Sequence, residues 1–198
     1  NNDGKNDLYF CGAAGQAGAL YIGLKKGFKF TKQTIFNEFK EWEDTEAVFF
    51  DVDGDKDLDL FVGSGGNSMQ IGSRELQDRI YINDGSGNFS IDTRALPPNG
   101  YNTSVAIPFD FDNDGDLDIF VGSRSYPGEY GMSPRSYIYQ NNGKGSFVDI
   151  LAQIKELSNP GMVTDAAWGD IDGDKKNELI IVGEWMAPLI LNYVNNRW

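Results

Sequence analysis

The chain has 198 residues, of which 40% are hydrophobic and 13% aromatic, so it is long and apolar enough to fold around a core and is not a disordered acidic tail. Its net charge of −13 excludes nucleic acid and anionic membrane surfaces as partners, because both need basic patches. The absence of histidine excludes His-based acid–base chemistry, His metal ligands and Ser-His-Asp triads. No apolar stretch is long enough to insert into a membrane, and we expect the single Cys11 to be a buried small hydrophobe.

An acidic loop recurs along the chain. Residues 51–59 read D-V-D-G-D-K-D-L-D, residues 110–118 read D-F-D-N-D-G-D-L-D, and residues 170–178 read D-I-D-G-D-K-K-N-E. The first positions of these loops are 59 and 60 residues apart, a period typical of propellers and solenoids. Residues 1–7 match the end of the same pattern, and we expect the natural polypeptide to extend upstream of them.

The composition of the loop points to a bound cation. Five like charges on one strand face would repel one another, and Asn113 and Gly115 favour a turn because both tolerate positive φ. Ca²⁺ takes six to eight oxygen ligands in irregular geometry, whereas Mg²⁺ requires a stricter octahedron. An EF-hand loop is disfavoured, since the flanks are β-type and position twelve is Val62, Val121 or Ile181 instead of an acid.

Each repeat has the plan of a four-stranded propeller blade. An apolar strand precedes the loop, another follows it, and glycine turns lead from a third strand to a fourth. We predict an all-β fold, a partial β-propeller of about three and a half blades within one domain. The expected repeats span residues 1–46, 47–103, 104–161 and 162–198, and residues 150–157 are expected to form one or two helical turns.

The loop D-x-D-x-D-G-x-x-D, followed by an apolar triplet and glycine, resembles the FG-GAP/VCBS repeat of integrin-α-type β-propellers. The last unit, with G-M-V-T-D-A-A-W before its loop and G-E-W-M after it, is similar to VCBS-repeat surface proteins of Bacteroidota-type bacteria, some of which carry an ASPIC/UnbV segment. The resemblance implies that the loop joins the innermost strand to the second strand. It also implies that Ca²⁺ is bound by side chains at positions one, three, five and nine and by the backbone carbonyl at position seven.

Carried over to this chain, the resemblance implies about three calcium sites and a truncated fourth. The side-chain ligands would be Asp51, Asp53, Asp55 and Asp59, then Asp110, Asp112, Asp114 and Asp118, then Asp170, Asp172, Asp174 and Glu178. The carbonyl ligands would be those of Asp57, Asp116 and Lys176, with the carboxylate of Asp116 left to solvent. The truncated site would keep Asn1, Asp3, Asp7 and the carbonyl of Lys5. Position six, glycine in the family, is lysine at Lys56 and Lys175.

The resulting functional hypothesis is a calcium-stabilised, extracellular or cell-surface module that recognises a protein or a glycan and is not an enzyme. Sites of this kind fill at the millimolar Ca²⁺ found outside cells, and we expect a secreted or outer-membrane-associated bacterial protein. An accessory or catalytic domain of a polysaccharide lyase or hydrolase is the alternative. The long connectors 63–78 and 122–136 supply the candidate ligand-binding residues Arg74, Arg124, Tyr126, Tyr130 and Arg135. We expect further blades of a longer chain, or self-association, to complete the ring, because open strand edges would otherwise be exposed.

Overall fold

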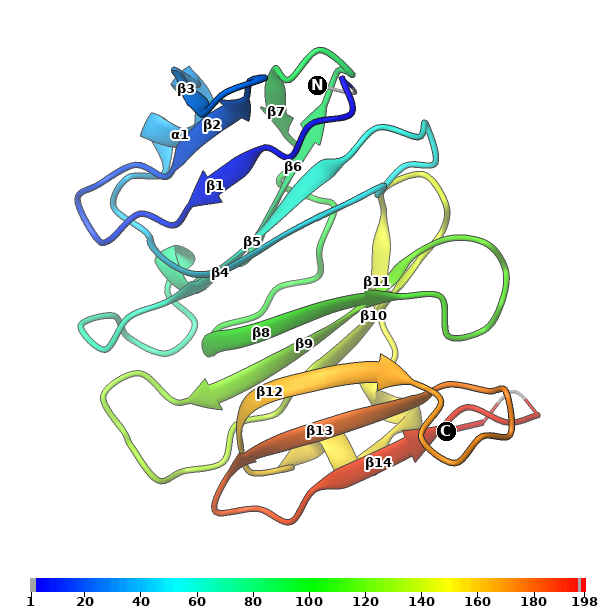
Figure 1. The fold of residues 1–198 in the computed structure, drawn as a ribbon. Coiled ribbons are helices and arrows are strands. Elements are labelled where there is room, and N and C mark those ends of the chain that lie inside the picture. Colours follow the sequence, from blue (N-terminus) through cyan, green and yellow to red (C-terminus); the bar gives the residue numbers. More distant parts are fainter. Residues whose placement is uncertain (1–2, 196) are drawn as a thin grey trace.

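The computed structural model describes residues 3–195 and 197–198. Over these residues the chain forms fourteen strands in four antiparallel sheets, which succeed one another along the molecule without closing into a ring (Figure 1). This arrangement confirms the prediction of an all-β partial propeller. No described helix is long and apolar enough to cross a bilayer.

Within each sheet, the strands follow one another in chain order. The first sheet contains β1 (Leu8–Phe10), β2 (Ala19–Gly23) and β3 (Phe28–Thr31), and the second contains β4 (Glu43–Phe50), β5 (Asp59–Gly65), β6 (Arg79–Asn83) and β7 (Phe89–Ile91). The third contains β8 (Asn102–Phe109), β9 (Asp118–Ser125), β10 (Tyr137–Asn141) and β11 (Phe147–Asp149). The fourth contains β12 (Met162–Gly169), β13 (Glu178–Glu184) and β14 (Leu189–Asn192). Among the described residues, the first sheet has no counterpart of β4 and the fourth has no counterpart of β7.

Several strands extend beyond their apolar sequence signal. Strand β4 starts at Glu43, although its first four residues are polar, because they pair with the end of β5 around a bulge between Asp44 and Glu46.

The helical turns expected at 150–157 are two 3₁₀ turns, η2 (Leu151–Gln153) and η3 (Lys155–Ser158). The short helix α1 (Thr34–Glu38) and the 3₁₀ turn η1 (Arg74–Leu76) were not predicted, since a single helical turn leaves little periodicity in the sequence.

The core consists of three apolar layers, one between each pair of neighbouring sheets. Alternate residues of β5 face opposite neighbours: Leu60 and Val62 pack toward the first sheet, and Phe61 packs toward the third. All three are fully buried. The continuous apolar run after each acidic loop is therefore the signature of a strand that is covered on both faces.

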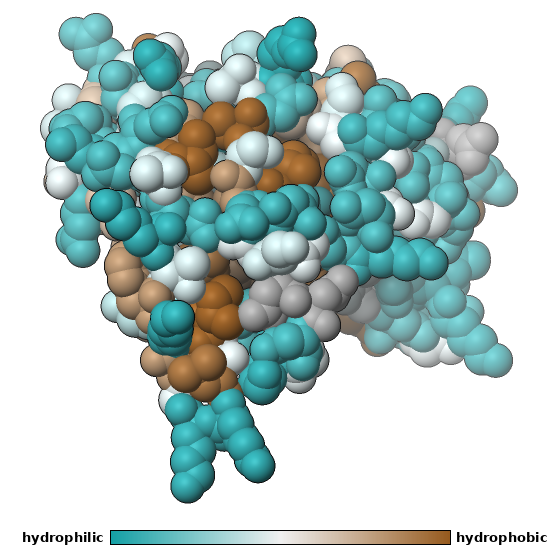
Figure 2. Space-filling view, turned by 90° about the horizontal axis from the view of Figure 1, so that it is seen from above, coloured by the Kyte–Doolittle hydropathy of each residue, from teal (hydrophilic) through white to brown (hydrophobic). Residues whose placement is uncertain are grey.

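The outer face of the first sheet carries exposed apolar side chains. Phe10, Tyr21 and Phe30 form an edge-to-face row across β1, β2 and β3, and Phe10 and Phe30 are 56% and 54% exposed. The view from that side of the molecule shows apolar groups between hydrophilic ones (Figure 2). Cys11, just beyond β1, is also exposed, so the prediction of a buried thiol was wrong. The apolar character of the strand before Cys11 does not bury it, because this edge of β1 is uncovered.

The acidic loops and the long connectors lie at opposite ends of the sheets. In Figure 1 the loops of residues 51–58, 110–117 and 170–177 are on the right, and the connectors after β5, β9 and β13 are on the left. In every complete hairpin, the ninth loop position pairs with the last residue of the preceding strand, as Asp59 does with Phe50 and Asp118 with Phe109. The register of each sheet thus fixes where its acidic loop closes.

Candidate metal centre

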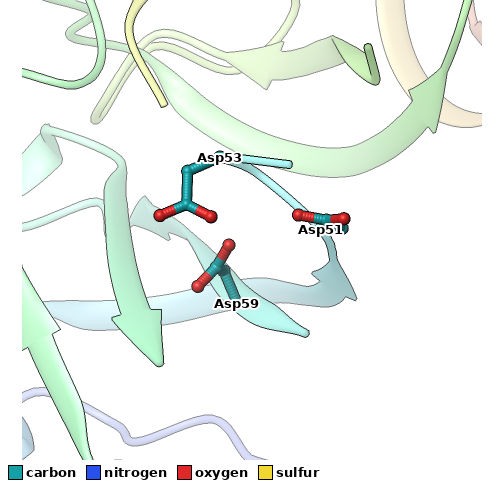
Figure 3. A group of neighbouring side chains, drawn as sticks. All are labelled: Asp51, Asp53 and Asp59. Carbon is teal, nitrogen blue, oxygen red and sulfur yellow. The ribbon is translucent and has the colours of Figure 1, made fainter. Parts of the chain in front are cut away.

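Each complete acidic loop gathers three carboxylates around one point. In the second loop they belong to Asp51, Asp53 and Asp59, and oxygen atoms of the three lie within 4.8 Å of one another (Figure 3). Positions one, three and nine form the same group in the other two loops: Asp110, Asp112 and Asp118, and Asp170, Asp172 and Glu178.

The ninth-position carboxylate anchors the loop to the sheet. Asp59 is 1% exposed; its Oδ2 accepts a hydrogen bond from the Val52 N–H at 2.8 Å, and its Oδ1 accepts one from the Asn83 N–H at 2.8 Å. Asp118 is equally buried and makes the corresponding bond to the third strand of its own sheet, from the Asn141 N–H at 2.8 Å. Burial raises the pKa of Asp59 to about 6 and that of Asp118 to about 7. A nearby cation would favour the charged form of both groups, so ion binding and protonation would compete there.

Glu178 holds the ninth position of the fourth loop with one additional methylene group. It is 3% exposed, and its Oε2 accepts a hydrogen bond from the Ile171 N–H at 3.1 Å. This bond corresponds to the one that Val52 donates to Asp59. The longer side chain therefore reaches the same position within the loop.

The fifth-position carboxylates, which were predicted as ligands, bind the backbone of their own loops. Asp55 Oδ1 accepts a hydrogen bond from the Asp57 N–H at 2.9 Å, and Asp114 Oδ1 accepts one from the Asp116 N–H at 3.0 Å. They lie outside the three-carboxylate groups, as does Asp174, which accepts from the Lys176 N–H. The carbonyls of Asp57, Asp116 and Lys176 stay predicted ligands.

The aspartates at position seven are partly or fully buried, whereas Lys176 at the same position is exposed. The Asp57 side chain is buried, with the residue 4% exposed, and Asp116 is half-buried. The Asp116 carboxylate lies so close to Gly143 that a β-carbon added there would come within 2.3 Å of it. We expected this carboxylate to face solvent, and Asp116 keeps only part of that exposure because the glycine turn of the third sheet packs against it.

The loop reverses direction through two left-handed residues, at positions four and six. In each loop one of them is glycine and the other is lysine or asparagine: Gly54 and Lys56 (φ +82° and +75°), Asn113 and Gly115 (+61° and +96°), Gly173 and Lys175 (+82° and +71°). The lysines at position six therefore adopt the same left-handed conformation as Gly115 at position six of the third loop. They do so at the cost of left-handed geometry in a residue with a β-carbon.

The truncated first loop retains part of this design. Asn1 lies outside the described residues, while Asp3 accepts a hydrogen bond from the Lys5 N–H at 3.0 Å and forms an ion pair with its side chain. Asp7 Oδ1 accepts a hydrogen bond from the Gly23 N–H at 2.8 Å. That bond ties the loop to the neighbouring strand as Asp59 and Asp118 do, so Asp7 keeps the anchoring role.

At the opposite end, three of the five predicted ligand-binding residues are engaged in separate contacts. The Arg74 guanidinium lies 5.1 Å from the ring centre of Trp42, on the outer side of the second sheet. Arg135 forms an ion pair with Asp149, and Tyr126 packs edge-on against another tyrosine. The structure therefore does not unite these residues in one surface.

The other two, Arg124 and Tyr130, meet at Glu184. Glu184 accepts hydrogen bonds from the Arg124 guanidinium at 2.7 Å and from the Tyr130 hydroxyl. Arg124 and Tyr130 also line a hollow of about 570 Å³ between the starts of β4, β8 and β12 and the ends of β5 and β9, which we call the polar hollow. Sequence reasoning missed Glu184 and the adjacent Trp185, because they lie on a short connector 60 residues downstream of Arg124.

The sequence comparisons agree with the repeated geometry. Residues 1–62 and 51–121 each match the FG-GAP-like repeat, and together the two matches cover more than half of the chain. The protein belongs to the FG-GAP-like repeat family. A search of curated proteins found no match to the chain.

The residues of these FG-GAP-like loops suit a hard divalent cation. In the third loop, Asp110 Oδ2 accepts a hydrogen bond from the Gly115 N–H at 3.2 Å, whereas its Oδ1 is buried and has no hydrogen-bond partner among the described residues. A buried carboxylate oxygen without a donor is destabilising, and a cation would satisfy it. The donor set consists of oxygen atoms, the ligand type that Ca²⁺ takes.

Proposed function

We propose that the protein is a calcium-stabilised, extracellular β-propeller module that recognises a protein or a glycan. The observation that carries this proposal is the recurrence of one three-carboxylate group at the same end of three successive sheets. In each loop the ion would be held by positions one, three and nine, with the predicted carbonyl at position seven. It would neutralise clustered charge and pin the hairpin between the first two strands.

The two ends of the sheets would have different roles, ion binding at the loop end and ligand recognition at the connector end. The loop end carries the carboxylate groups, and the connector end carries the polar hollow with Arg124, Tyr130 and Glu184. Binding residues commonly lie on loops that a rigid scaffold positions. Ions at the loop end would therefore stabilise the sheets that place the connectors.

A polysaccharide lyase or hydrolase is the second candidate, and the chemistry of Tyr130 argues against a lyase that uses this tyrosine as its base. A lyase of this type needs a tyrosine or lysine whose pKa is lowered enough to remove a proton near neutral pH. Here the hydrogen bond to Glu184 raises the pKa of Tyr130. The adjacent carboxylate thus keeps this hydroxyl protonated near neutral pH, which makes Tyr130 unsuited to be such a base.

The location and the assembly are part of the same proposal. FG-GAP-like repeats usually occur in extracellular proteins, where millimolar Ca²⁺ fills sites of moderate affinity, and we propose a secreted or outer-membrane-associated bacterial protein of the VCBS-repeat, ASPIC/UnbV-associated type. The exposed aromatic row of the first sheet would pack against a further blade, supplied by a longer chain or by a second copy.

Thermal unfolding with and without Ca²⁺ tests the proposal. We expect a lower melting temperature in excess EDTA than in millimolar Ca²⁺, because each ion bound only by the folded state stabilises it by about 2.7 kcal/mol at a hundred times its Kd. Elemental analysis of the purified protein should find calcium. An unchanged melt in EDTA, together with metal-free protein, would overturn the calcium part of the proposal.

A further inference from the structure

We propose that the connector end binds a neutral glycan, with one sugar ring stacked on Trp185 and neighbouring sugar hydroxyls bonded to the polar hollow. This inference rests on the recognition role proposed above and names its ligand class. It is carried by four observations: an exposed aromatic pair, the left-handed backbone of Trp185, the pairing of Arg124 with Glu184, and the exposed hydroxyl and amide groups of the polar hollow.

The aromatic pair consists of Trp185 and Tyr130. Trp185 is 76% exposed and Tyr130 66% exposed, and their ring centres lie 5.8 Å apart at 70°. The indole rests against Gly131, where an added β-carbon would come within 2.7 Å of the ring. Because Gly131 has no side chain, the indole packs directly against its backbone, while most of the indole surface faces solvent. A rigid, exposed aromatic surface of this kind is suited to stack on the apolar C–H face of a sugar ring.

The backbone of Trp185 adopts a conformation that bulky residues avoid. Its φ is +57°, in the left-handed region, and glycine would fit there without strain. Strained residues of this kind persist where their surroundings hold them in place, and they concentrate at functional sites. A tryptophan that is both exposed and strained adds little to folding, so its presence points to a ligand.

The positive charge of Arg124 is already neutralised by a carboxylate. The Arg124 guanidinium donates to Glu184, and Glu43 also lines the polar hollow, in a chain of net charge −13. An anionic ligand would be repelled by these carboxylates, and Arg124 would not offset the repulsion because its positive charge is already paired with Glu184. A neutral ligand with hydroxyl groups avoids that repulsion.

The polar hollow is lined by hydroxyl and amide side chains, of which Asn102 is the most buried amide. Asn102 is 9% exposed; its Nδ2 donates to Ser125 Oγ at 2.9 Å and to Asn67 Oδ1 at 3.2 Å. Its Oδ1 is buried and has no hydrogen-bond partner in the described part of the chain. Because solvent does not reach this oxygen, the groups that the hollow offers to a ligand are those of the exposed Thr45, Asn67 and Thr164, and its volume of about 570 Å³ is that of a typical small-ligand site.

The lining distinguishes a glycan from a protein partner. Protein interfaces place their binding energy in apolar pockets that are filled by aromatic or arginine anchors. The polar hollow is instead lined mainly by amide, hydroxyl and carboxylate groups, and its aromatic surface lies at the rim. Many directional hydrogen bonds beside one stacking surface match a sugar better than a peptide.

The test is a titration of the calcium-saturated full chain with neutral hexasaccharides of glucose, mannose, galactose and xylose, and with a uronic acid hexasaccharide for comparison. Calorimetry and tryptophan fluorescence would report binding. We expect at least one neutral hexasaccharide to bind and to change the fluorescence. Trp185→Gly should weaken that binding at least tenfold, since it removes the ring while glycine accepts the backbone conformation. Tyr130→Ser is a second variant that removes the other ring of the pair.

The matched control is Phe28→Ser, which removes a 51% exposed aromatic ring on the distant first sheet and should leave binding unchanged. No binding of any neutral hexasaccharide at millimolar concentration would overturn the inference, as would unchanged binding by both Trp185→Gly and Tyr130→Ser, or tighter binding of the uronic acid hexasaccharide. Each of these results is distinct from a failure of the calcium proposal, which the melting temperature in EDTA reports independently.

Discussion

Asn141 joins the second and third sheets at the level of the acidic loops. Its Nδ2 donates a hydrogen bond at 2.8 Å to the carbonyl oxygen of Val52, 89 residues earlier in the chain, and another at 3.1 Å to that of Leu117 in its own sheet. Val52 lies between Asp51 and Asp53, so one amide couples the turn of the third sheet to the carboxylate group of the second. Asn141 is 6% exposed, and water cannot easily replace it.

Asn141→Ala should therefore destabilise the protein by about 2–3 kcal/mol, because several buried backbone groups lose their partners. Asn83→Ala is the matched control, since Asn83 donates to the Leu58 carbonyl in its own sheet but its side chain makes no hydrogen bond to another sheet within the described residues. Urea unfolding of both variants would measure the difference. An Asn83→Ala variant as costly as Asn141→Ala would show that the bond to Val52 contributes nothing.

The third acidic loop separates ligands from structural carboxylates. Asp112→Ala should remove one Ca²⁺ from the stoichiometry measured by calorimetry, because Asp112 belongs to the three-carboxylate group. Asp116→Ala should keep that ion, since its carboxylate packs against Gly143 outside the group. Asp114→Ala then decides whether position five is a ligand or only binds the Asp116 N–H. Loss of the ion in Asp116→Ala but not in Asp112→Ala would contradict this assignment.

Replacing only Arg79 in its buried ion pair with Asp44 should lower the stability of the protein strongly. Both side chains are 4% exposed, and Asp44 also accepts hydrogen bonds from the Tyr9 hydroxyl at 2.9 Å and the Gly12 N–H at 3.0 Å, which tie the first sheet to the second. Arg79→Leu would leave a buried carboxylate without its counter-charge, at a cost of about 3–5 kcal/mol.

Tyr9→Phe, which removes one neutral donor from the same carboxylate, should cost only about 1 kcal/mol. Chemical denaturation of the two variants gives the comparison. Equal costs would mean that Arg79 acts as one hydrogen-bond donor among several and not as the counter-charge.

Stability should also depend on pH through Asp78. This carboxyl is 3% exposed, and burial raises its pKa to about 7, although the Ser64 N–H, the Thr103 hydroxyl and the Asn99 amide donate hydrogen bonds to it. The folded state therefore holds the proton more tightly than the unfolded state. The contribution of Asp78 to stability is largest below about pH 4, falls as pH rises toward about 7, and is constant above that.

Unfolding of the wild type and of Asp78→Asn in saturating Ca²⁺ would show this contribution as a difference. Between about pH 4 and 7, the free energy of unfolding of the wild type should fall relative to that of the variant by up to about 1.4 kcal/mol per pH unit. A difference that is constant over this range, or that grows with pH, would show that the three donors keep Asp78 ionised in the folded state.

Much of the fold was readable from local sequence. The apolar run after each acidic loop, such as Phe61 between Leu60 and Val62, identifies a strand covered on both faces. The period near 60 residues predicts one sheet for each repeat. The loops were predictable for the same reason: their clustered carboxylates lie within nine residues, so spacing alone brings Asp51, Asp53 and Asp59 together. The position-five carboxylates were less predictable, because they accept hydrogen bonds from the loop's own backbone, as Asp55 does from the Asp57 N–H.

The sequence by itself determined the net charge of −13, and it determined the repeated blade and its acidic loops because these depend on neighbours along the chain. Only the tertiary structure decided which connector residues meet. Arg124 and Tyr130 contact Glu184 and Trp185, about 60 residues away in the chain. Arg74 instead packs on Trp42, and Arg135 pairs with Asp149. Such contacts depend on how successive sheets pack and rotate against one another, which no local pattern specifies.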